Sequence, residues 1–347
     1  MLYQNVSVET FASQLPPHQL TSLKVEEMLA PAYSRLNFSP GRLELFTGIK
    51  ERRYWDLTAV PSAVAAEAGA KAMQQAGLLP EDIDAVIHCS VCRDFLEPAT
   101  ASVVHQILKL PAHCVNFDIS NACLGLISGM SVLADMVSSG RIRRGLVVSG
   151  EIGYPLLRRT VAHLNNDPTI KRQDFKLHFA SLTIGSCAAA AIVSRSDIAK
   201  PGSHRLVSIT DHADTSQNHL CRGSADSGMG GDSGPLMLTD SETLLHRGIA
   251  AASAAWPRFL AENGGRSFDR VVTHQVGTAH TALLFKNLGL DPSLDHPTFP
   301  FLGNCGSASL PATAALATQA GHLKPGHRVA LLGIGSGINV GLAALEW

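Results

Sequence analysis

Cys123 is the residue of this chain best placed to act as a nucleophile. It follows the strand-like run 115–119 and the small residues 120–122, and an apolar helical pattern begins directly after it. A thiol at a helix N-terminus faces unpaired backbone N–H groups and the positive end of the helix dipole, and both favour the thiolate. A cysteine in an apolar segment is more often an inert core residue. The position of Cys123 nevertheless predicts a reactive thiol.

His274 and Asn304 are the residues that could support such a thiol. A thiolate nucleophile needs a base or electrophile nearby, and the oxyanion that develops on a thioester carbonyl needs hydrogen-bond donors. His274 ends a buried strand pattern, so by itself it could be an ordinary core histidine. Asn304 stands at a helix start, so by itself it could be a helix cap. The combination of cysteine, histidine and asparagine is much more specific than any one of them.

The glycines of Gly333-Ile-Gly-Ser-Gly337 permit a tight turn near the C-terminus. Backbone N–H groups in such a turn could face the sulfur, and we expect the amides of Cys123 and Ser336 to form an oxyanion hole. A merely tight loop is the competing explanation for the same glycines.

The other cysteines indicate neither a disulfide framework nor a metal site. The chain has seven cysteines at irregular spacing, which is typical of a protein in a reducing compartment. Cys89-Ser-Val-Cys92 has the spacing of a redox or zinc pair, yet it ends a strand pattern and no second pair accompanies it. We therefore predict no metal.

The composition is that of a globular protein with a large core. The chain has 347 residues, of which 45% are hydrophobic and 16% charged, and its formal net charge is -1. No long basic run is present, which argues against nucleic acid as a partner. The N-terminus has no signal-peptide pattern, and no stretch reaches the ~20 apolar residues of a spanning helix. These features predict a cytoplasmic protein without membrane insertion.

The chain contains a weak internal duplication of alternating strands and helices. In the first half the predicted strands cover 84–91, 114–119, 145–150 and 187–194, with helices at 99–109 and after Cys123. In the second half the strands cover 269–276, 328–337 and 338–345, with helices at 279–288 and after Asn304. This pattern indicates mixed sheets covered on both faces. We predict an α/β protein with an N-terminal half of residues 1–200 and a C-terminal half of residues 201–347.

The duplication also predicts where the functional residues meet. Two equivalent halves packed about a pseudo-twofold axis would bring together the loop after Val272 and the helix starts at Cys123 and Asn304. Two segments lie outside this scheme. The polar segment 154–176 is predicted to be a surface excursion, and the Gly-rich 224–234 stretch is predicted to be a loop without a nucleotide-binding role.

Long segments of the chain resemble the thiolase superfamily, in the branch of ketoacyl-ACP synthase III. The resemblance covers nearly the whole chain and is carried by the Cys-His-Asn set together with the segments 1–7, 93–102, 116–124, 274–276, 302–311 and 330–339. Within the branch, the chain is most similar to the enzymes that join two acyl-CoA molecules head to head in bacterial olefin biosynthesis. The resemblance implies a thiolase fold, in which two duplicated βαβαβ-type halves form a five-layered αβαβα core.

The resemblance also implies a role for each site residue. Cys123 is the acylated nucleophile, and His274 and Asn304 polarise the thioester carbonyl and stabilise the enolate. Glu97, in the marker segment Arg93-Asp-Phe-Leu-Glu-Pro98, reaches into the partner subunit's site and serves as the base, which implies a homodimer. Without the resemblance, a glutamate before a proline on a loop would be interpreted as solvated.

The function that the resemblance implies is a non-decarboxylative Claisen condensation of two fatty acyl-CoA molecules to a 2-alkyl-3-oxo acid, with release of coenzyme A. The coenzyme A thioesters are substrates, and no cofactor is expected. Enzymes of an olefin or β-lactone pathway would act downstream. Arg222 is the one weak candidate for a coenzyme A contact. Cys305, Ser307 and the 224–234 loop depart from the family pattern, which bears on substrate placement and loop closure.

Two other functions remain open at this point. A decarboxylating 3-oxoacyl-ACP synthase III uses the same cysteine, histidine and asparagine with malonyl-ACP as extender, and it needs no base such as Glu97. A catalytically silent partner subunit that shapes a chain-length pocket is the second alternative, and the intact Cys123, His274 and Asn304 argue against it.

Overall fold

A computed structural model describes residues 1–223 and 237–347 of the chain. The N-terminal half contains β1 (Val6–Gln14), β2 (His18–Thr21), α1 (Ser22–Met28), α2 (Ala30–Leu36), α3 (Arg42–Thr47), β3 (Glu51–Tyr54), α4 (Pro61–Ala76), β4 (Ala85–His88), α5 (Thr100–Ile107), β5 (Val115–Asp118), α6 (Gly125–Ser138), β6 (Arg144–Glu151), α7 (Tyr154–Asn166), α8 (Arg172–His178) and β7 (Cys187–Arg195). The C-terminal half contains β8 (His204–Ala213), β9 (Cys221–Arg222), β10 (Leu238–Thr239), α9 (Ser241–Glu262), β11 (Arg270–Thr273), α10 (Thr278–Leu288), α11 (Phe299–Leu302), α12 (Ser309–Gln319), β12 (Arg328–Gly335) and β13 (Asn339–Glu346). Two short 3-10 turns matter for the site, η2 (Ala122–Leu124) and η6 (Gly306–Ala308).

In the described residues, nine strands form one mixed sheet in which the two halves meet at a narrow seam, and β2–β3 and β9–β10 form two separate two-stranded sheets. The order in the nine-stranded sheet is β11-β12-β13-β8-β1-β7-β6-β4-β5. β1 and β8 pair only at Ser7–Arg205 and Val8–His204, whereas β1 and β7 pair along almost their whole length. β4 pairs in parallel with β5 and β6, and β11 pairs in parallel with β12. The predicted mixed sheet is therefore confirmed.

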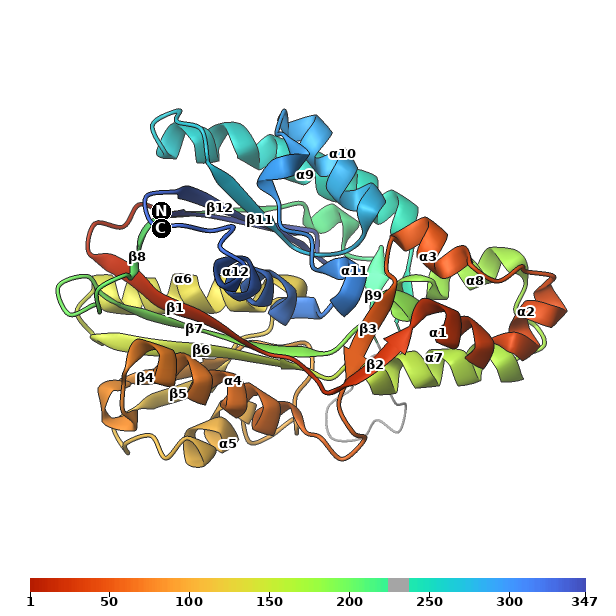
Figure 1. Cartoon of the computed structure of the whole chain (residues 1–347), viewed down its shortest axis with the longest axis horizontal. Helices are drawn as coiled ribbons and strands as arrows, with labels where there is room; N and C mark the ends of the chain where they lie inside the picture. Colours follow the sequence, from red (N-terminus) through yellow and green to blue (C-terminus); the bar gives the residue numbers. More distant parts are fainter. Residues whose placement is uncertain (224–236) are drawn as a thin grey trace.

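Helices cover the sheet on both faces, because its strands are apolar on both faces. All eight residues of β6 and all eight of β12 are buried. Figure 1 shows the layers in order: α9 and α10, the strands of the C-terminal half, α6 and α12, the strands of the N-terminal half, and α4 and α5. The expected five-layered αβαβα arrangement is confirmed. Where the two halves divide along the chain, near residue 200, stays a prediction.

The polar segment 154–176 is more regular than the sequence indicates. It forms α7 and α8, and Leu157, Val161 and Leu164 of α7 are buried in one cluster with residues of α1 and α2. The spacing of these three residues places them on one face of α7, so α7 is an amphipathic helix and the segment is not only a surface excursion. The predicted 224–234 loop lies outside the described residues.

No helix in the described ranges is long and apolar enough to cross a membrane. Within those same ranges, no group of three or more His, Cys, Asp or Glu side chains has a geometry that could hold a metal ion.

Candidate active site

Cys123 lies in the tight connection between β5 and α6. It is the middle residue of η2, and the residue before it, Ala122, has a φ of 43°, in the left-handed region. A residue other than glycine adopts this conformation at a cost, and such residues are found preferentially at functional sites. The turn therefore ends the strand abruptly and places Cys123 at the beginning of the buried helix α6.

Two glycines of β12 allow the strand to pass directly beside this turn. A Cβ atom on Gly333 would overlap the side chain of Leu124, and one on Gly335 would lie 3.6 Å from the backbone N of Cys123. Ser336 follows the strand, and its carbonyl accepts a hydrogen bond of 3.4 Å from Nδ2 of Asn339. The close approach of this segment to Cys123 is confirmed, and the oxyanion hole from the amides of Cys123 and Ser336 stays a prediction.

Asn304 is held by its backbone and by its side-chain oxygen. Its N–H donates to Thr183 O (3.0 Å), and its carbonyl accepts from Gly185 N (2.9 Å). Its Oδ1 atom accepts from Gly306 N (3.0 Å). Because Oδ1 makes this bond, the NH2 group is the end of the carboxamide that can donate to an oxyanion.

Ser307 joins the helix start at Asn304 to the helix start at Cys123. Its Oγ atom accepts from Leu126 N (3.1 Å) and donates to Cys89 O (2.5 Å). These bonds link η6, α6 and the end of β4 although the residues lie far apart in the sequence. The predicted convergence of the two helix starts is therefore confirmed.

His274 lies directly after β11, on the strand next to β12. Its N–H donates to Leu332 O (2.8 Å), one residue before Gly333. The side chain is buried, and its Nδ1 atom has no hydrogen-bond partner among the described residues. Burial and the nearby His280 lower the pKa of His274 to about 3, so the imidazole is neutral near neutral pH. The sequence reasoning missed His280, which in the sequence is only a second histidine six residues after His274.

The expectation that the helix start favours a Cys123 thiolate is wrong. Cys123 is partly buried, and desolvation of its sulfur, followed by the charges of Glu151 and Cys221, raises the pKa of Cys123 to about 12. Desolvation disfavours the charged form of a thiol, and here it outweighs the helix N-terminus. Cys123 is therefore a protonated thiol near neutral pH.

Glu151 is a functional-site residue that the sequence reasoning did not find. This buried residue ends β6, and its carboxylate accepts from the backbone N–H groups of Val91 (2.9 Å), Cys92 (3.2 Å) and Ser307 (3.0 Å). Burial raises the pKa of Glu151. It thus joins the loop after β4 to the loop that carries Asn304. Its only signal in the sequence was a single glutamate directly after the apolar run 145–150.

The structure does not bring every predicted residue to the nucleophile. Glu97 lies on the exposed loop between β4 and α5, where Phe95 and Leu96 are also exposed, at 55% and 46%. Arg222 is exposed in β9, directly after Cys221, the neighbour of Cys123. All seven cysteines are free, including the pair of the Cys-x-x-Cys spacing, Cys89 and Cys92.

The five-layered fold and the cysteine turn between the two halves define a condensing enzyme of the thiolase superfamily. Residues 117–159 match the family described as 3-oxoacyl-[acyl-carrier-protein (ACP)] synthase III, and residues 262–347 match its C-terminal part. Two curated relatives are similar over their full length, and both are named acyl-CoA:acyl-CoA alkyltransferase. The protein from Xanthomonas campestris pv. campestris is 38% identical over 349 residues, and the one from Shewanella oneidensis is 35% identical over 352 residues, with 100% of both chains covered in each case. The chain belongs to the acyl-CoA:acyl-CoA alkyltransferase family.

Solved structures of Xanthomonas campestris OleA agree with this assignment. A cysteine-to-alanine variant superposes with a TM-score of 0.93 at 37% identity, covering 100% of this chain and 98% of that one. A cysteine-to-serine variant with bound lauric acid and lauroyl-CoA superposes with a TM-score of 0.91 at 37% identity, covering 100% of both chains.

Proposed function

We propose that this protein condenses two fatty acyl-CoA molecules to a 2-alkyl-3-oxo acid without decarboxylation. The observation that carries the proposal is the junction of the Cys123 turn with the Asn304 loop through Ser307, in a chain that is similar over its full length to acyl-CoA:acyl-CoA alkyltransferases. The lauroyl-CoA found in a Xanthomonas OleA structure supports acyl-CoA as the class of substrate.

The first half-reaction transfers an acyl group to Cys123. The sulfur of Cys123 attacks the thioester carbonyl of an acyl-CoA, and His274 and Asn304 polarise that carbonyl. The NH2 group of Asn304 and the amides of Cys123 and Ser336 donate to the oxyanion. The C–S bond to coenzyme A then breaks, and coenzyme A leaves with a proton as the free thiol.

The second half-reaction forms the carbon–carbon bond. Glu97 of the partner subunit removes a proton from the α-carbon of a second acyl-CoA, and the enolate attacks the acyl-Cys123 carbonyl. The bond to Cys123 breaks, which gives a 2-alkyl-3-oxoacyl-CoA. Water hydrolyses its thioester to the acid and a second coenzyme A. The general base contributes about 10²–10⁴-fold, and oxyanion stabilisation contributes most of the rest.

Solved variants of Xanthomonas OleA support the roles of Cys123 and Glu97. They include replacements of one cysteine and one glutamate, and these two residues are separated by the same number of residues as Glu97 and Cys123. A third set replaces a histidine, the residue type of His274.

A homodimer is part of the proposal, because Glu97 would act in the site of a second copy. β5 is the edge strand of the nine-stranded sheet, and the loop that carries Glu97 exposes Val91, Phe95 and Leu96. An unpaired edge strand beside exposed apolar side chains is typical of a subunit interface.

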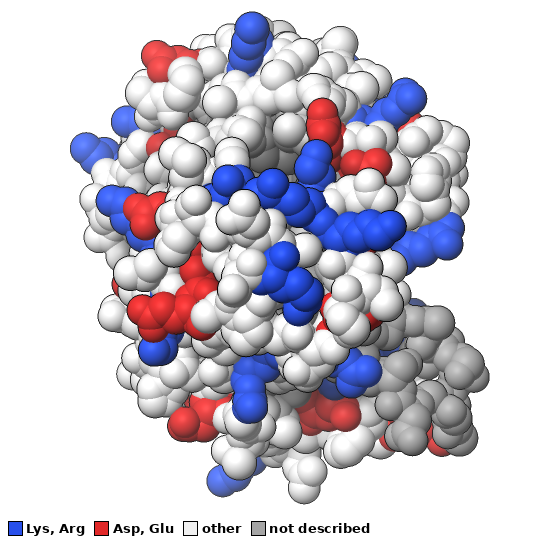
Figure 2. Space-filling model, turned by 90° about the vertical axis from the view of Figure 1, so that its right-hand side faces the viewer, with Lys and Arg blue, Asp and Glu red and all other residues white. Residues whose placement is uncertain are grey.

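A basic face supports binding of the coenzyme A phosphates. Figure 2 shows Lys and Arg side chains in a band across one end of the molecule, the end that α1–α3, α7 and α8 form in Figure 1. Exposed basic residues on these helices include Arg158, Arg172 and Lys176. Such a band attracts a polyanionic ligand. We further propose that Arg222 contacts coenzyme A. We also propose that the protein is cytoplasmic and that an olefin- or β-lactone-forming enzyme acts on its product.

The second candidate function is a decarboxylating 3-oxoacyl-ACP synthase III. The match of two segments to that family favours it. Incubation of the purified protein with acyl-CoA alone separates the two functions. We expect release of coenzyme A, a mass increase of one acyl group on Cys123, and a β-keto acid or the ketone formed from it. A strict requirement for malonyl-ACP would overturn the proposal.

Two variants complete this test. Cys123→Ala should show no acyl adduct, and Glu97→Ala should form the adduct but stall before condensation. The absence of any adduct in the wild-type protein would revive the silent-subunit alternative, whereas normal condensation by Glu97→Ala would remove the base from the mechanism.

A further inference from the structure

The segment that carries Glu97 is a short loop closed at its base. The N–H of Asp94 donates to Oγ1 of Thr100 (3.3 Å), the first residue of α5, and this bond spans Phe95, Leu96 and Glu97. Thr100 is fully buried, whereas those three residues are exposed. The base of the loop is therefore part of the core, and its tip points outward.

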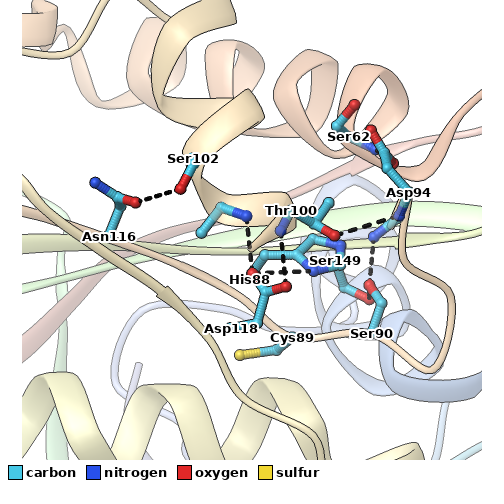
Figure 3. Close-up of polar contacts among 12 residues, drawn as sticks. Ser62, His88, Cys89, Ser90, Asp94, Thr100, Ser102, Asn116, Asp118 and Ser149 are labelled. Carbon is cyan, nitrogen blue, oxygen red and sulfur yellow. Dashed lines mark hydrogen bonds and ion pairs between the residues drawn. The ribbon is translucent and has the colours of Figure 1, made fainter. Parts of the chain in front are cut away.

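Two aspartates attach the two ends of this loop to the rest of the fold (Figure 3). At the first end, Oδ1 of Asp94 accepts from Ser62 N (2.9 Å) at the start of α4. At the second end, Asp118 accepts from Thr100 N (2.8 Å) and from Ala101 N (2.8 Å), so it caps the first turn of α5. These bonds fix the direction in which the chain leaves the loop.

Asp118 is also close to the nucleophile along the chain. It is the last residue of β5, and the turn that carries Cys123 follows it. Behind Asp118 lies the buried His88, whose Nδ1 atom is 3.8 Å from Oδ1 of Asp118. On the other side, Oγ of Ser90 and Oγ of Ser149 are 3.0 Å apart, which ties the residues after β4 to β6.

We propose that Asp118 is a positioning residue for Glu97 in the condensation step. Its carboxylate holds the start of α5, and the start of α5 holds the base of the loop from which Glu97 extends to the partner subunit. This inference rests on the proposed role of Glu97 as the base. It adds a residue that touches no substrate and acts only through the placement of that carboxylate.

The test is the variant Asp118→Asn, measured in each half-reaction separately. An asparagine at this position keeps one acceptor oxygen but turns an NH2 group toward the second N–H of α5, so one of the two bonds is lost. A displacement of about 1 Å in a catalytic group can lower a rate by about 10²-fold. We expect condensation to fall by roughly 10–100-fold while the rate of Cys123 acylation stays close to that of the wild type.

Asp84→Asn is the matched control. Asp84 lies just before β4, at the end of that strand away from the Glu97 loop, and its Oδ2 atom accepts from two successive backbone N–H groups, those of Arg143 (2.7 Å) and Arg144 (3.2 Å). Because an asparagine can keep both bonds on its Oδ1, Asp84→Asn removes chiefly the negative charge that faces Arg143 (3.4 Å), and both half-reactions should stay unchanged. Thr100→Val is the second test variant, because it removes the acceptor for Asp94 N–H and keeps the shape of the buried side chain. We expect the same selective loss of condensation.

The double variant Glu97→Ala/Asp118→Asn separates positioning from a general structural effect. If Asp118 acts through Glu97, the slow residual condensation that remains without the general base in Glu97→Ala should not fall further in the double variant. Three results would overturn the inference while the base assignment stands. They are a further loss of condensation rate in the double variant, equal losses of acylation and condensation rate in Asp118→Asn, and normal condensation by Asp118→Asn. Normal condensation by Glu97→Ala would instead show that the proposed function itself has the wrong base.

Discussion

Burial rather than the helix N-terminus controls the Cys123 thiol. Desolvation of the sulfur and the charge of the buried Glu151 both oppose the thiolate. Acylation therefore requires that the thiol proton leave as the sulfur attacks the thioester carbonyl. The imidazole of His274 is neutral because burial lowers its pKa to about 3.

At this scale we predict an unusual pH dependence for alkylation of Cys123. Because the pKa of Cys123 is raised to about 12, the thiolate fraction is small at pH 7 and grows with pH. The rate of iodoacetamide labelling at Cys123, followed by peptide mass spectrometry, should rise without a plateau past about pH 8.5, the pKa of an ordinary thiol. Glu151→Gln removes a carboxylate that opposes the thiolate, so its labelling profile should shift to lower pH.

Glu26→Gln serves as the control for this experiment. Glu26 is also a buried carboxylate bonded to backbone N–H groups, those of Gly41 and Leu43, but it lies in α1, in a different core cluster. Its labelling profile should match that of the wild type. A plateau near pH 8.5 in the wild-type protein would contradict the desolvated environment described for the Cys123 sulfur.

At the scale of elements, the site depends on contacts that leave no room for a side chain. Gly185, just before β7, lies against the segment 302–304 and donates its N–H to Asn304 O (2.9 Å). A Cβ atom there would overlap the backbone carbonyl oxygen of Leu302, and backbone cannot move aside as a flexible side chain can. The position of Asn304 therefore depends on a glycine that carries no chemistry of its own.

Gly185→Ala should consequently damage both stability and catalysis. We expect a loss of about 1–3 kcal/mol or more in the free energy of unfolding, as for other overpacked sites, measured by urea denaturation. Acylation of Cys123 should slow because the Asn304 carboxamide moves. Gly69→Ala in α4 is the control, since its new methyl would meet only side-chain methyl groups at 3.2 Å, which can shift. Wild-type stability in Gly185→Ala would contradict the packing described here.

At the scale of the whole molecule, the proposed mechanism needs residues from two copies of the chain. Cys123, His274 and Asn304 belong to one protomer, and Glu97 extends on an exposed loop beside the edge strand β5. A monomer would therefore acylate Cys123 but lack the base for condensation.

Mixed dimers test this arrangement directly. Cys123→Ala and Glu97→Ala subunits, co-expressed with different tags, should form a heterodimer with one complete site, in which the intact Cys123 of one protomer meets the intact Glu97 of the other. We expect about half of the wild-type condensation rate per dimer, since one of two sites is complete, with both homodimeric variants inactive. If Glu97 acted within its own protomer, the heterodimer would be as inactive as its parents.

Much of this protein was predictable from local sequence. The strand before Cys123 and the helix after it were correctly predicted, because alternation of apolar runs and turns reflects interactions between near neighbours. The family was correctly predicted from the resemblance of long segments of the chain to the thiolase superfamily. The amphipathic helix α7 shows the limit of that reasoning, because its polar residues conceal three buried ones.

Tertiary structure alone decided how the site is joined and how its groups titrate. The bond between Leu126 and Ser307 spans 181 positions in the sequence, and the one between Val91 and Glu151 spans 60. Such contacts depend on the packing of whole elements, which no local pattern contains. The pKa of Cys123 also depends on the tertiary structure. Desolvation of the sulfur is caused by neighbours from the whole fold, and not only by the helix that follows the residue.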